Sequence, residues 1–217
     1  MIITIDGPAG SGKSTAARML AEQLGVRFLD TGAMYRSIAL AVLQAGVAPE
    51  DADAVTQVAE YCRIDMPDDR ILLNSVDVTT AIREPEVTLA ASIVAAHAGV
   101  RRRLVALQQA VGQAGPLVTE GRDQGTIVFP NATCKFFLTA SLAARAARRQ
   151  AELRKKSLPS RLEDVTEQIQ QRDERDEQRA TAPMKPAADA LLIDTSDLTI
   201  EQVVQQLLKA ISNRSSG

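Results

Sequence analysis

Residues 2–14 read Ile2-Ile-Thr-Ile-Asp-Gly-Pro-Ala-Gly-Ser-Gly-Lys-Ser14, a β-branched run that leads directly into a glycine-rich loop. The part from Gly7 to Ser14 matches the pattern G-x-x-x-x-G-K-[ST] of the phosphate-binding loop. After the loop, apolar residues recur at the spacing of one helix face as far as Leu24, and Gly25 stands where a helix would end. Strand, loop and helix therefore occur in the order that phosphate binding requires.

The chemistry of this loop predicts a bound nucleoside triphosphate, ATP, together with Mg²⁺. Glycines let backbone N–H groups converge on phosphate oxygens, and the N-terminus of the following helix adds a favourable field. Lys13 can reach the outer phosphates, and the Ser14 hydroxyl can bind the metal. The residues predicted to bind the nucleotide are Gly7, Pro8, Ala9, Gly10, Ser11, Gly12, Lys13, Ser14 and Thr15. The alternative is a glycine-rich turn without a ligand, and the agreement of strand, loop and helix argues against it.

Composition narrows the class of protein. The 217 residues suffice for one domain with a sizeable core, and 45% hydrophobic with 24% charged residues is the balance of a globular protein. A net charge of −2 gives no reason to expect a nucleic-acid partner. No apolar run approaches the roughly 20 residues of a membrane span, and no basic leader precedes the first strand, so we expect a cytoplasmic protein. Cys62 and Cys134 are predicted to be reduced and buried.

Strands alternate with helices along the chain, which favours an α/β fold with a parallel sheet and helices on both faces. Further strands are expected at residues 26–29, 117–120, 135–138 and 191–194, and a last helix over about 199–211. Asp30, Arg122 and Asp123 follow two of these strands. Because such sheets bind ligands at the carboxyl ends of their strands, these side chains are candidate site residues.

Two intervals interrupt this alternation. Residues 38–115 are too many for one crossover and contain a strand-like patch with a turn signal at Pro67–Arg70, which predicts a small inserted antiparallel sheet. Residues 142–183 are highly charged and predict an exposed helical lid that breaks near Pro159. The chain is thus expected to be a single P-loop domain. Its core comprises about residues 1–37, 116–141 and 184–217, with an insert at 38–115 and a lid at 142–183.

Arginines are concentrated in the second interval, at Arg145, Arg148, Arg149, Arg172, Arg175 and Arg179. The last three are spaced three and four apart, which would place them on one helix face. Acidic neighbours allow a solvated helix with weak ion pairs. The other interpretation is a mobile lid whose guanidinium groups stabilise a transferring phosphoryl group while excluding water. The phosphate-binding loop favours the lid.

Four later motifs follow the loop in order: Asp30-Thr-Gly-Ala-Met-Tyr-Arg36, Gly121-Arg-Asp-Gln-Gly-Thr126, Arg172-Asp-Glu-Arg-Asp-Glu-Gln-Arg179 and Pro183-Met-Lys-Pro-Ala-Ala-Asp189. With these motifs the chain resembles the bacterial cytidylate kinases, a family of nucleoside monophosphate kinases, from residue 2 to about 208. The resemblance implies ATP-dependent phosphorylation of CMP and dCMP, a monophosphate-binding insert and a lid. The expected partners are these nucleotides alone, and the expected state is a monomer.

The resemblance also implies roles for individual residues. The positions that match ligands of the CMP phosphate are Arg36, Arg122 and Arg179, and Thr31 stands near them where the family often has serine. The positions that match cytosine contacts are Ser92, Arg101 and Asp123, and those near the ribose are Arg172 and Asp176. From the first lid cluster we choose Arg148 to approach the ATP phosphates. The predicted catalytic residues are therefore Lys13, Arg148 and Arg179.

Three carboxylates have competing interpretations. Asp123 can accept a hydrogen bond from the exocyclic amine of cytosine, where uracil presents a carbonyl, or it can pair structurally with Arg122. Asp30 can orient Mg²⁺ through water, making it with Ser14 a candidate metal residue, or it can cap the next helix. Asp6 is expected to be structural.

Three classes of function remain compatible with the loop. The first is a kinase acting on CMP, with UMP or another small acceptor as the alternative. The second is a P-loop ATPase or GTPase switch, although the sequence has no N/T-K-x-D guanine motif and no convincing D-x-x-G switch. The third is a noncatalytic nucleotide-binding module, against which the intact Lys13, Ser14 and lid arginines argue. A kinase needs no general base here, because the acceptor phosphate is already an anionic nucleophile.

Overall fold

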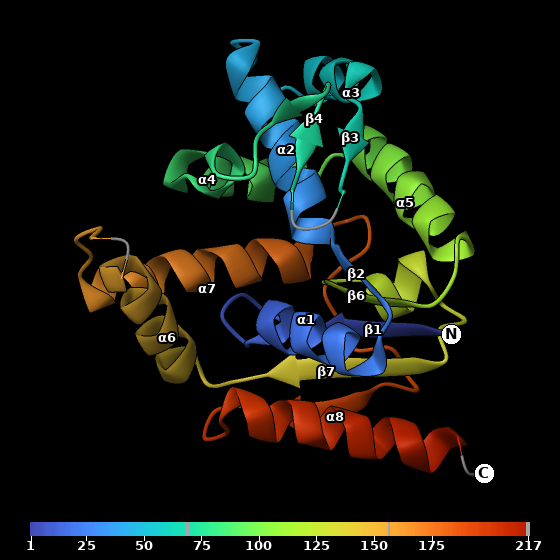
Figure 1. The fold of residues 1–217 in the computed structure, drawn as a ribbon. Helices are drawn as coiled ribbons and strands as arrows, with labels where there is room; N and C mark the ends of the chain where they lie inside the picture. Colours follow the sequence, from blue (N-terminus) through green and yellow to red (C-terminus); the bar gives the residue numbers. More distant parts are fainter. Residues whose placement is uncertain (68–69, 156, 216–217) are drawn as a thin grey trace. The chain divides into compact units, whose positions relative to one another are not determined.

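The computed structural model describes residues 1–67, 70–155 and 157–215 (Figure 1). The chain divides into two compact units, one of Met1–Leu29 with Ala114–Gly217 and the other of Asp30–Gln113. The first break lies at Asp30, ahead of the insert boundary expected near residue 38.

The described part of the first unit contains a five-stranded sheet in the order β2-β6-β1-β7-β8. Its strands are β1 (Ile2–Asp6), β2 (Arg27–Asp30), β6 (Leu117–Gly121), β7 (Cys134–Thr139) and β8 (Leu191–Asp194). The central strand β1 pairs in parallel with β6 and β7, and β7 pairs in parallel with β8. The register sets Asp6 opposite Gly121 and Phe137, so three carboxyl ends reach one edge. The predicted α/β fold with a parallel sheet is confirmed.

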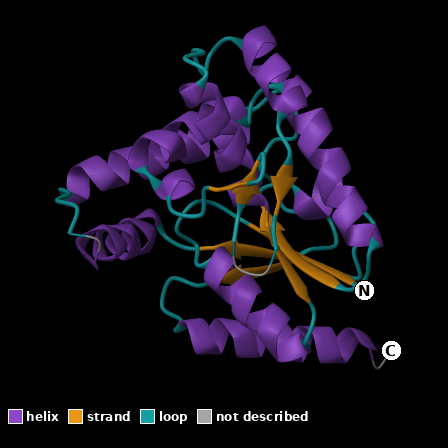
Figure 2. Cartoon of the chain, turned by 45° about the horizontal axis from the view of Figure 1, so that its top comes forward, coloured by secondary structure: helices purple, strands orange, loops and turns teal. Residues whose placement is uncertain are grey.

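The helices of this unit are α1 (Lys13–Leu24), α6 (Leu142–Lys155), α7 (Leu162–Gln178) and α8 (Ile200–Ser215), with a short π-helical turn η2 (Gln124–Val128). Figure 2 distinguishes these helices from the strands. The main core contains apolar side chains of α1 and α8 together with those of the strands, including Leu20, Leu207 and Leu138. Their burial fixes α1, and with it the loop that precedes α1, on the sheet.

Glycines shape both ends of α1. Gly7 has a φ of 147°, and a Cβ built on it would lie 2.0 Å from the carbonyl oxygen of Leu138, so only glycine lets the loop pass β7. At the other end Gly25 has a φ of 63° and caps the helix through its N–H, which donates to carbonyls of Ala21 and Glu22. This is the left-handed helix terminus that the sequence predicts.

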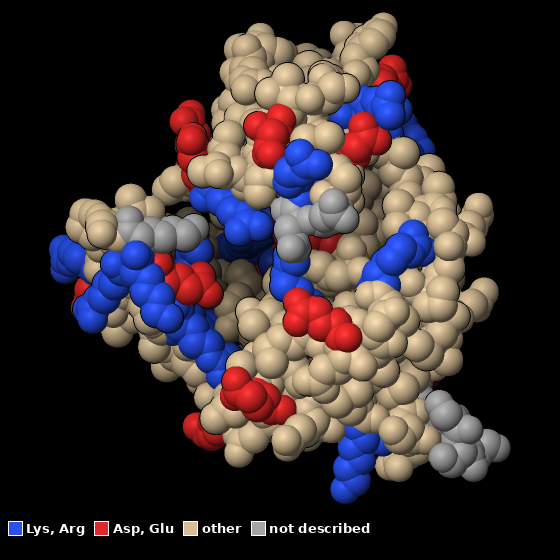
Figure 3. Space-filling model, in the orientation of Figure 1, with Lys and Arg blue, Asp and Glu red and all other residues tan. Residues whose placement is uncertain are grey.

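The two charged helices α6 and α7 are less exposed than expected. Ala146, Val165 and Ile169 form a small apolar core that holds the two helices together. Charged side chains are buried as well, among them Arg145 and Asp173. The exposed helices expected here are therefore present, but each has a buried inner face as well as an exposed outer one. Figure 3 shows basic side chains gathered over α6 on its outer surface.

The second unit is mainly helical. Its elements are α2 (Thr31–Gln44), α3 (Ala52–Tyr61), β3 (Ile64–Asp65), β4 (Leu72–Leu73), β5 (Val76–Asp77), the 3₁₀ turn η1 (Ala81–Arg83), α4 (Pro85–Val94) and α5 (Ala98–Gln113). The strands β3, β4 and β5 form the small antiparallel sheet predicted from the sequence. At the expected turn, the Arg70 N–H donates to the Pro67 carbonyl over 3.0 Å, while Asp68 and Asp69 lie outside the described residues.

Other sequence expectations have clear outcomes. Cys62 and Cys134 are both free thiols in buried positions, as predicted. The last helix, α8, continues to Ser215 and so ends four residues beyond the predicted 211. Within the described part of the chain, no helix is both long enough and apolar enough to cross a membrane.

Candidate active site

The phosphate-binding loop lies at the carboxyl end of β1 and leads into the first turn of α1. Lys13, the first residue of α1, is only 6% exposed, and its Nζ donates to the Pro8 carbonyl over 3.2 Å. Ser14 and Thr15 are exposed, so their hydroxyls are accessible at the helix N-terminus. This arrangement offers backbone N–H groups, an ammonium group and two hydroxyls to a phosphate chain.

Lys13 lies in a strongly charged environment. Its Nζ is 3.8 Å from Oε2 of Glu120, a buried residue near the end of β6. Burial lowers the pKa of Lys13 to about 7, and the charge of Arg122 acts in the same direction, whereas Glu120 opposes it. The ammonium form is thus held weakly in the absence of phosphates, which would stabilise it.

Arg122 and Asp176 form the next charged pair. Nε of Arg122 donates to Oδ2 of Asp176 over 2.8 Å, and both side chains are largely buried. Burial alone would lower the pKa of Arg122, but the Asp176 and Glu120 carboxylates outweigh it and raise that pKa. For Asp176 burial acts in the opposite direction and would raise the pKa. The charges of Arg122, Arg172 and Arg179 outweigh burial and lower this pKa below its ordinary value. Both groups therefore stay charged at neutral pH.

Arg179 belongs to the same cluster. Its Nη1 lies 4.0 Å from Oδ1 of Asp176, so one carboxylate faces two of the arginines that the family resemblance implies for the CMP phosphate. Arg179 is the C-cap of α7 and not part of the helix, which ends at Gln178. The helix therefore carries Arg172 and Arg175 only, and Arg179 reaches the cluster from its end.

Asp123 is held in a fixed turn. It is buried and precedes η2, and its backbone lies at φ −149° and ψ 23°. The next two N–H groups, those of Gln124 and Gly125, each donate to a carboxylate oxygen of Asp6 over 2.8 Å. Asp6 therefore fixes the backbone that carries Asp123, which is the structural role expected for it.

The chosen lid arginine, Arg148, contacts the segment after β8. Its Nη1 donates to Oγ1 of Thr195 over 3.1 Å, and its Nη2 donates to the Thr195 carbonyl. Thr195 Oγ1 also lies 3.0 Å from the Ser11 carbonyl of the loop. The structure thus links Arg148 to the loop through one threonine.

The remaining predicted residues lie in the second unit. Asp30 accepts a hydrogen bond from the Ala33 N–H over 2.8 Å and caps α2, and it pairs with Nη2 of Arg36 over 3.2 Å. Thr31 is buried at the first position of α2. Within the described residues, the buried Nε of Arg36 has no hydrogen-bond partner. An unsatisfied buried donor beside a charged head suits an anionic ligand.

Two predicted cytosine contacts, Ser92 and Arg101, are also buried in this unit. The Ser92 hydroxyl donates to the Leu89 carbonyl over 2.9 Å. The Arg101 guanidinium lies over the ring of Tyr35, 5.8 Å from its centroid, and its Nη1 donates to the Ala95 carbonyl over 3.4 Å. Such a cation–π contact helps to hold the guanidinium beside the ring.

Comparison with known proteins shows the family of this chain. The family model described as "Cytidylate kinase" matches residues 3–213. The chain belongs to the cytidylate kinase family. A cytidylate kinase of Paraburkholderia phymatum is 46% identical over 208 residues, which cover 96% of this chain and 91% of that protein. One from Burkholderia pseudomallei is 47% identical over 207 residues, covering 95% and 91%. The chain is therefore a nucleoside monophosphate kinase that phosphorylates CMP, and an ATPase switch is not favoured.

A solved structure supports the fold alone. Shikimate kinase from Bacteroides thetaiotaomicron superposes with a TM-score of 0.52 and 13% identity, covering 98% of both chains. At that identity the likeness says nothing of the acceptor. It does agree with the α/β fold described above.

The sequence-based interpretation missed one charged residue beside Lys13. Glu120 ends the apolar run of β6, directly before Gly121, and its carboxylate faces Lys13. A polar residue at the carboxyl end of a strand was the available signal. It was missed because only the register shows that β6 is the neighbour of β1.

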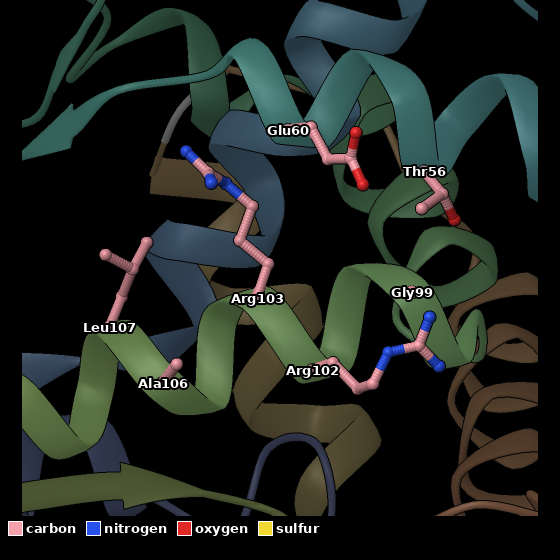
Figure 4. Close-up of a pocket in the computed structure, with 7 residues that line it drawn as sticks. All are labelled: Thr56, Glu60, Gly99, Arg102, Arg103, Ala106 and Leu107. Carbon is pink, nitrogen blue, oxygen red and sulfur yellow. The ribbon is translucent and has the colours of Figure 1, made fainter.

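A cavity in the second unit involves other residues. It is lined by Thr56, Glu60, Gly99, Arg102, Arg103, Ala106 and Leu107 of α3 and α5 (Figure 4). Arg102 and Arg103 leave α5 in different directions in that view, so their charges do not converge on one point. None of the predicted nucleotide ligands lines this cavity.

Proposed function

We propose that the chain transfers the γ-phosphoryl group of ATP to CMP and dCMP, with Mg²⁺ bound to the donor. The observation that supports this most is the run of buried charges from Lys13 through Glu120, Arg122 and Asp176 to Arg179. It begins in the phosphate-binding loop and ends at two arginines suited to a second phosphate. A nucleotide-binding module without transfer has no need for such a run.

In this proposal the loop holds the donor. Backbone N–H groups of the glycine-rich loop and of the first turn of α1 bind the β- and γ-phosphates, and the Lys13 ammonium neutralises charge as the phosphoryl group moves. An oxygen of the CMP phosphate bonds to the γ-phosphorus while the bond from that phosphorus to the β–γ bridging oxygen breaks. ADP leaves with that oxygen, and CDP forms.

The acceptor side depends on charge and hydrogen bonding. We assign Arg36, Arg122 and Arg179 to the CMP phosphate, with Thr31 near them, because guanidinium forks match phosphate oxygens. We assign Ser92, Arg101 and Asp123 to cytosine, and Arg172 and Asp176 to the ribose. Asp176 has a further role, since it orients Arg122 and Arg179 before the phosphate arrives.

The residues present fit a magnesium ion bound mainly by phosphates and water. Mg²⁺ typically uses one or two protein groups and keeps several waters. The exposed Ser14 hydroxyl is one such group, and Glu120 supplies a carboxylate beside Lys13. When bound, the ion would neutralise charge on the β- and γ-phosphates. A water-mediated role for Asp30 stays a prediction, since its carboxylate already caps α2 and pairs with Arg36.

The test is a product assay on the purified full chain with ATP and Mg²⁺. CMP, dCMP, UMP, AMP and GMP are supplied one at a time, and ADP, nucleoside diphosphate and inorganic phosphate are all measured. We expect one CDP for each ADP with CMP, a similar result with dCMP, and little product from the purines. A Lys13→Met variant that still folds should lose nearly all transfer. Release of inorganic phosphate without a diphosphate product would contradict the proposal.

Closure of α6 and α7 is a separate part of the proposal. Arg148 and Arg179 should become more protected when both nucleotides bind, because their charges then contact phosphates. Hydrogen exchange in α6 and α7 should therefore slow on addition of an ATP–CMP bisubstrate analogue. Unchanged exchange in these helices would indicate a rigid charged pair instead of a lid.

A further inference from the structure

Both backbone groups of Ala9, at the tip of the phosphate-binding loop, are held by side chains of α6 and α7. The Ala9 N–H donates to Oδ1 of Asp173 over 3.3 Å. The Ala9 carbonyl accepts from Nη1 of Arg145 over 3.1 Å. Nη1 of Arg145 also donates to Oδ2 of Asp173, which closes a ring of three groups. The loop, α6 and α7 therefore meet at one residue.

The ring is buried and its geometry is fixed. Arg145 and Asp173 are each only 8% exposed. Nε of Arg145 donates to the Ala140 carbonyl over 3.0 Å, which anchors the guanidinium to the segment that follows β7. A buried ion pair is costly to form and often adds no stability, so a contribution to stability does not by itself account for this pair. The exposed Arg149–Glu152 pair on the same helix shows the ordinary alternative of a solvated surface pair.

The loop also touches α6 directly beside this ring. A Cβ built on Gly10 would lie 3.0 Å from Cβ of Arg145 and 3.2 Å from its carbonyl oxygen. With a φ of 76°, Gly10 additionally adopts a conformation that other residues rarely take. One turn further along α6, Arg148 supports Ser11 through Thr195. The tip of the loop is thus supported at consecutive residues, and only the Ala9 support includes a charge from α7.

We infer that Arg145 and Asp173 are positioning residues for the phosphate donor, which hold the tip of the loop in its binding shape before ATP arrives. The reason is that a glycine-rich loop loses much conformational freedom when it wraps a phosphate chain. Side chains that fix its backbone beforehand remove part of that cost from binding. This inference rests on one part of the proposed function, namely that the loop binds ATP.

Two isosteric or charge-preserving variants test the ring. Asp173→Asn keeps an oxygen for the Ala9 N–H but turns an amide toward Arg145, and Arg145→Lys keeps the charge but loses the fork. The matched control is Glu174→Gln, which removes a neighbouring, exposed carboxylate of α7. All variants are compared with wild type by thermal unfolding, so that only folded proteins are interpreted.

The first readouts need no acceptor. Hydrogen exchange of residues 7–12 in the absence of nucleotide should speed up in Asp173→Asn and Arg145→Lys, and stay unchanged in Glu174→Gln. The Kd for ATP with Mg²⁺ should rise about tenfold, as for the loss of one charge-assisted hydrogen bond. These results would hold even if the acceptor were not CMP, so they separate this inference from the proposed function.

Kinetics and a double variant complete the test. The KM for ATP should rise by the same factor as its Kd, while the KM for CMP changes less than about twofold. Because the two residues act as one unit, the double variant should lose no more than the worse single variant. Loop exchange and ATP affinity at wild-type values in a folded Asp173→Asn protein would overturn the inference. The inference would also be overturned if the increases in the Kd for ATP multiplied in the double variant. An equal rise of the KM for ATP and the KM for CMP, together with a lower Tm, would overturn it as well.

Discussion

Lys13 is a buried cation in the phosphate-binding loop, and its burial makes the ammonium form less favourable in the empty enzyme. Burial, together with the charges of Arg122 and Arg172, lowers the pKa of Lys13 to about 7, although the charge of Glu120 acts in the other direction. A phosphate chain would reverse this balance, because its negative charges favour the ammonium form. Binding of ATP and protonation of Lys13 are therefore linked.

The first prediction concerns this link. Above pH 7 the lowered pKa leaves Lys13 increasingly neutral in the empty enzyme, and bound phosphates would favour its ammonium form up to the ordinary Lys range. ATP binding should therefore take up as much as one proton, and ATP affinity should fall as pH rises through this window. Titration calorimetry near pH 8 in two buffers of different ionisation enthalpy measures the uptake. Lys13→Met serves as control for protons taken up by ATP itself, and equal uptake by both proteins would contradict the prediction.

Asp123 gives the second prediction, on base selection. Asp123→Asn keeps the size of the side chain but replaces one acceptor oxygen with a donor, which can face the uracil carbonyl. Loss of a charged hydrogen bond to a buried base should lower kcat/KM for CMP by about ten- to a hundredfold. The CMP/UMP ratio should narrow, and the KM for ATP should not change. Steady-state kinetics with both acceptors gives these values.

The control for Asp123→Asn is a substitution of the neighbouring residue, Arg122. Arg122→Lys should weaken every monophosphate alike, because the lost fork binds phosphate and not base. If Asp123→Asn lowered CMP and UMP activity by the same factor, Asp123 would be structural. Selectivity would then have to come from Ser92 or Arg101.

At the scale of elements, α3 and α5 of the second unit pack through one close contact. A Cβ built on Gly99, near the start of α5, would lie 2.3 Å from Oγ1 and 2.4 Å from Cγ2 of Thr56. The Thr56 hydroxyl is itself held, since it donates to the Ala52 carbonyl over 2.7 Å. Glycine at this position therefore reflects the distance between two helices and not helix propensity, which would favour alanine.

The third prediction follows from that contact. Gly99→Ala should destabilise the protein by about 1–3 kcal/mol, because overpacking outweighs the gain in helix propensity. Thr56→Ala in the same chain should recover much of the loss, since it removes the two nearest atoms. Urea unfolding of the two single variants and the double variant measures this. A Gly99→Ala protein more stable than wild type would show that the helices separate at little cost.

In helices α6 and α7 the helical extents were predicted from the sequence, but the buried faces were not. Their sequences predicted two helices with a break near Pro159. The structure agrees, because α6 ends at Lys155 and α7 begins at Leu162. Their inner faces were not predicted, because Arg145, Asp173 and Asp176 are charged residues that would ordinarily face water. Burial became possible only because each charge has a partner on another element.

At the scale of the whole molecule, Asp6 links the central strand to the turn that presents Arg122 and Asp123. Burial raises the pKa of Asp6 to about 7, although the N–H groups of Gly125 and Gln124 act in the other direction. The folded state therefore binds this proton more tightly than the unfolded state, where the pKa is near 3.8. Its contribution to stability is complete below about pH 4 and is lost as pH rises to about 7.

The fourth prediction is a difference in pH dependence. The free energy of unfolding of wild type should fall, relative to that of Asp6→Asn, by up to a few kcal/mol between pH 4 and 7. The comparison removes the contribution of all other titrating groups, provided that they are unchanged. Denaturant unfolding at several pH values checks it, and parallel curves for the two proteins would show that Asp6 does not titrate in this range.

The sequence by itself determined the features that depend on residues close together in the chain. The loop between β1 and α1 and the glycine that ends α1 both rest on spacings of a few residues. For Asp30 the sequence left a helix cap and a metal role open, and the structure shows the cap. The strands and their order in the chain were predictable for the same reason, since alternation of apolar and turn residues is local. The motifs that identify the cytidylate kinase family are likewise short and read directly.

Only the tertiary structure decided which of these local features meet. Ala9 and Asp173 are 164 residues apart, and Asp6 and Gln124 are 118 apart, yet each pair shares a hydrogen bond. Glu120 faces Lys13 because β6, not the next strand in the chain, lies beside β1. Such pairings depend on strand register and helix packing, which are set by burial over the whole core. No local spacing in the sequence records them.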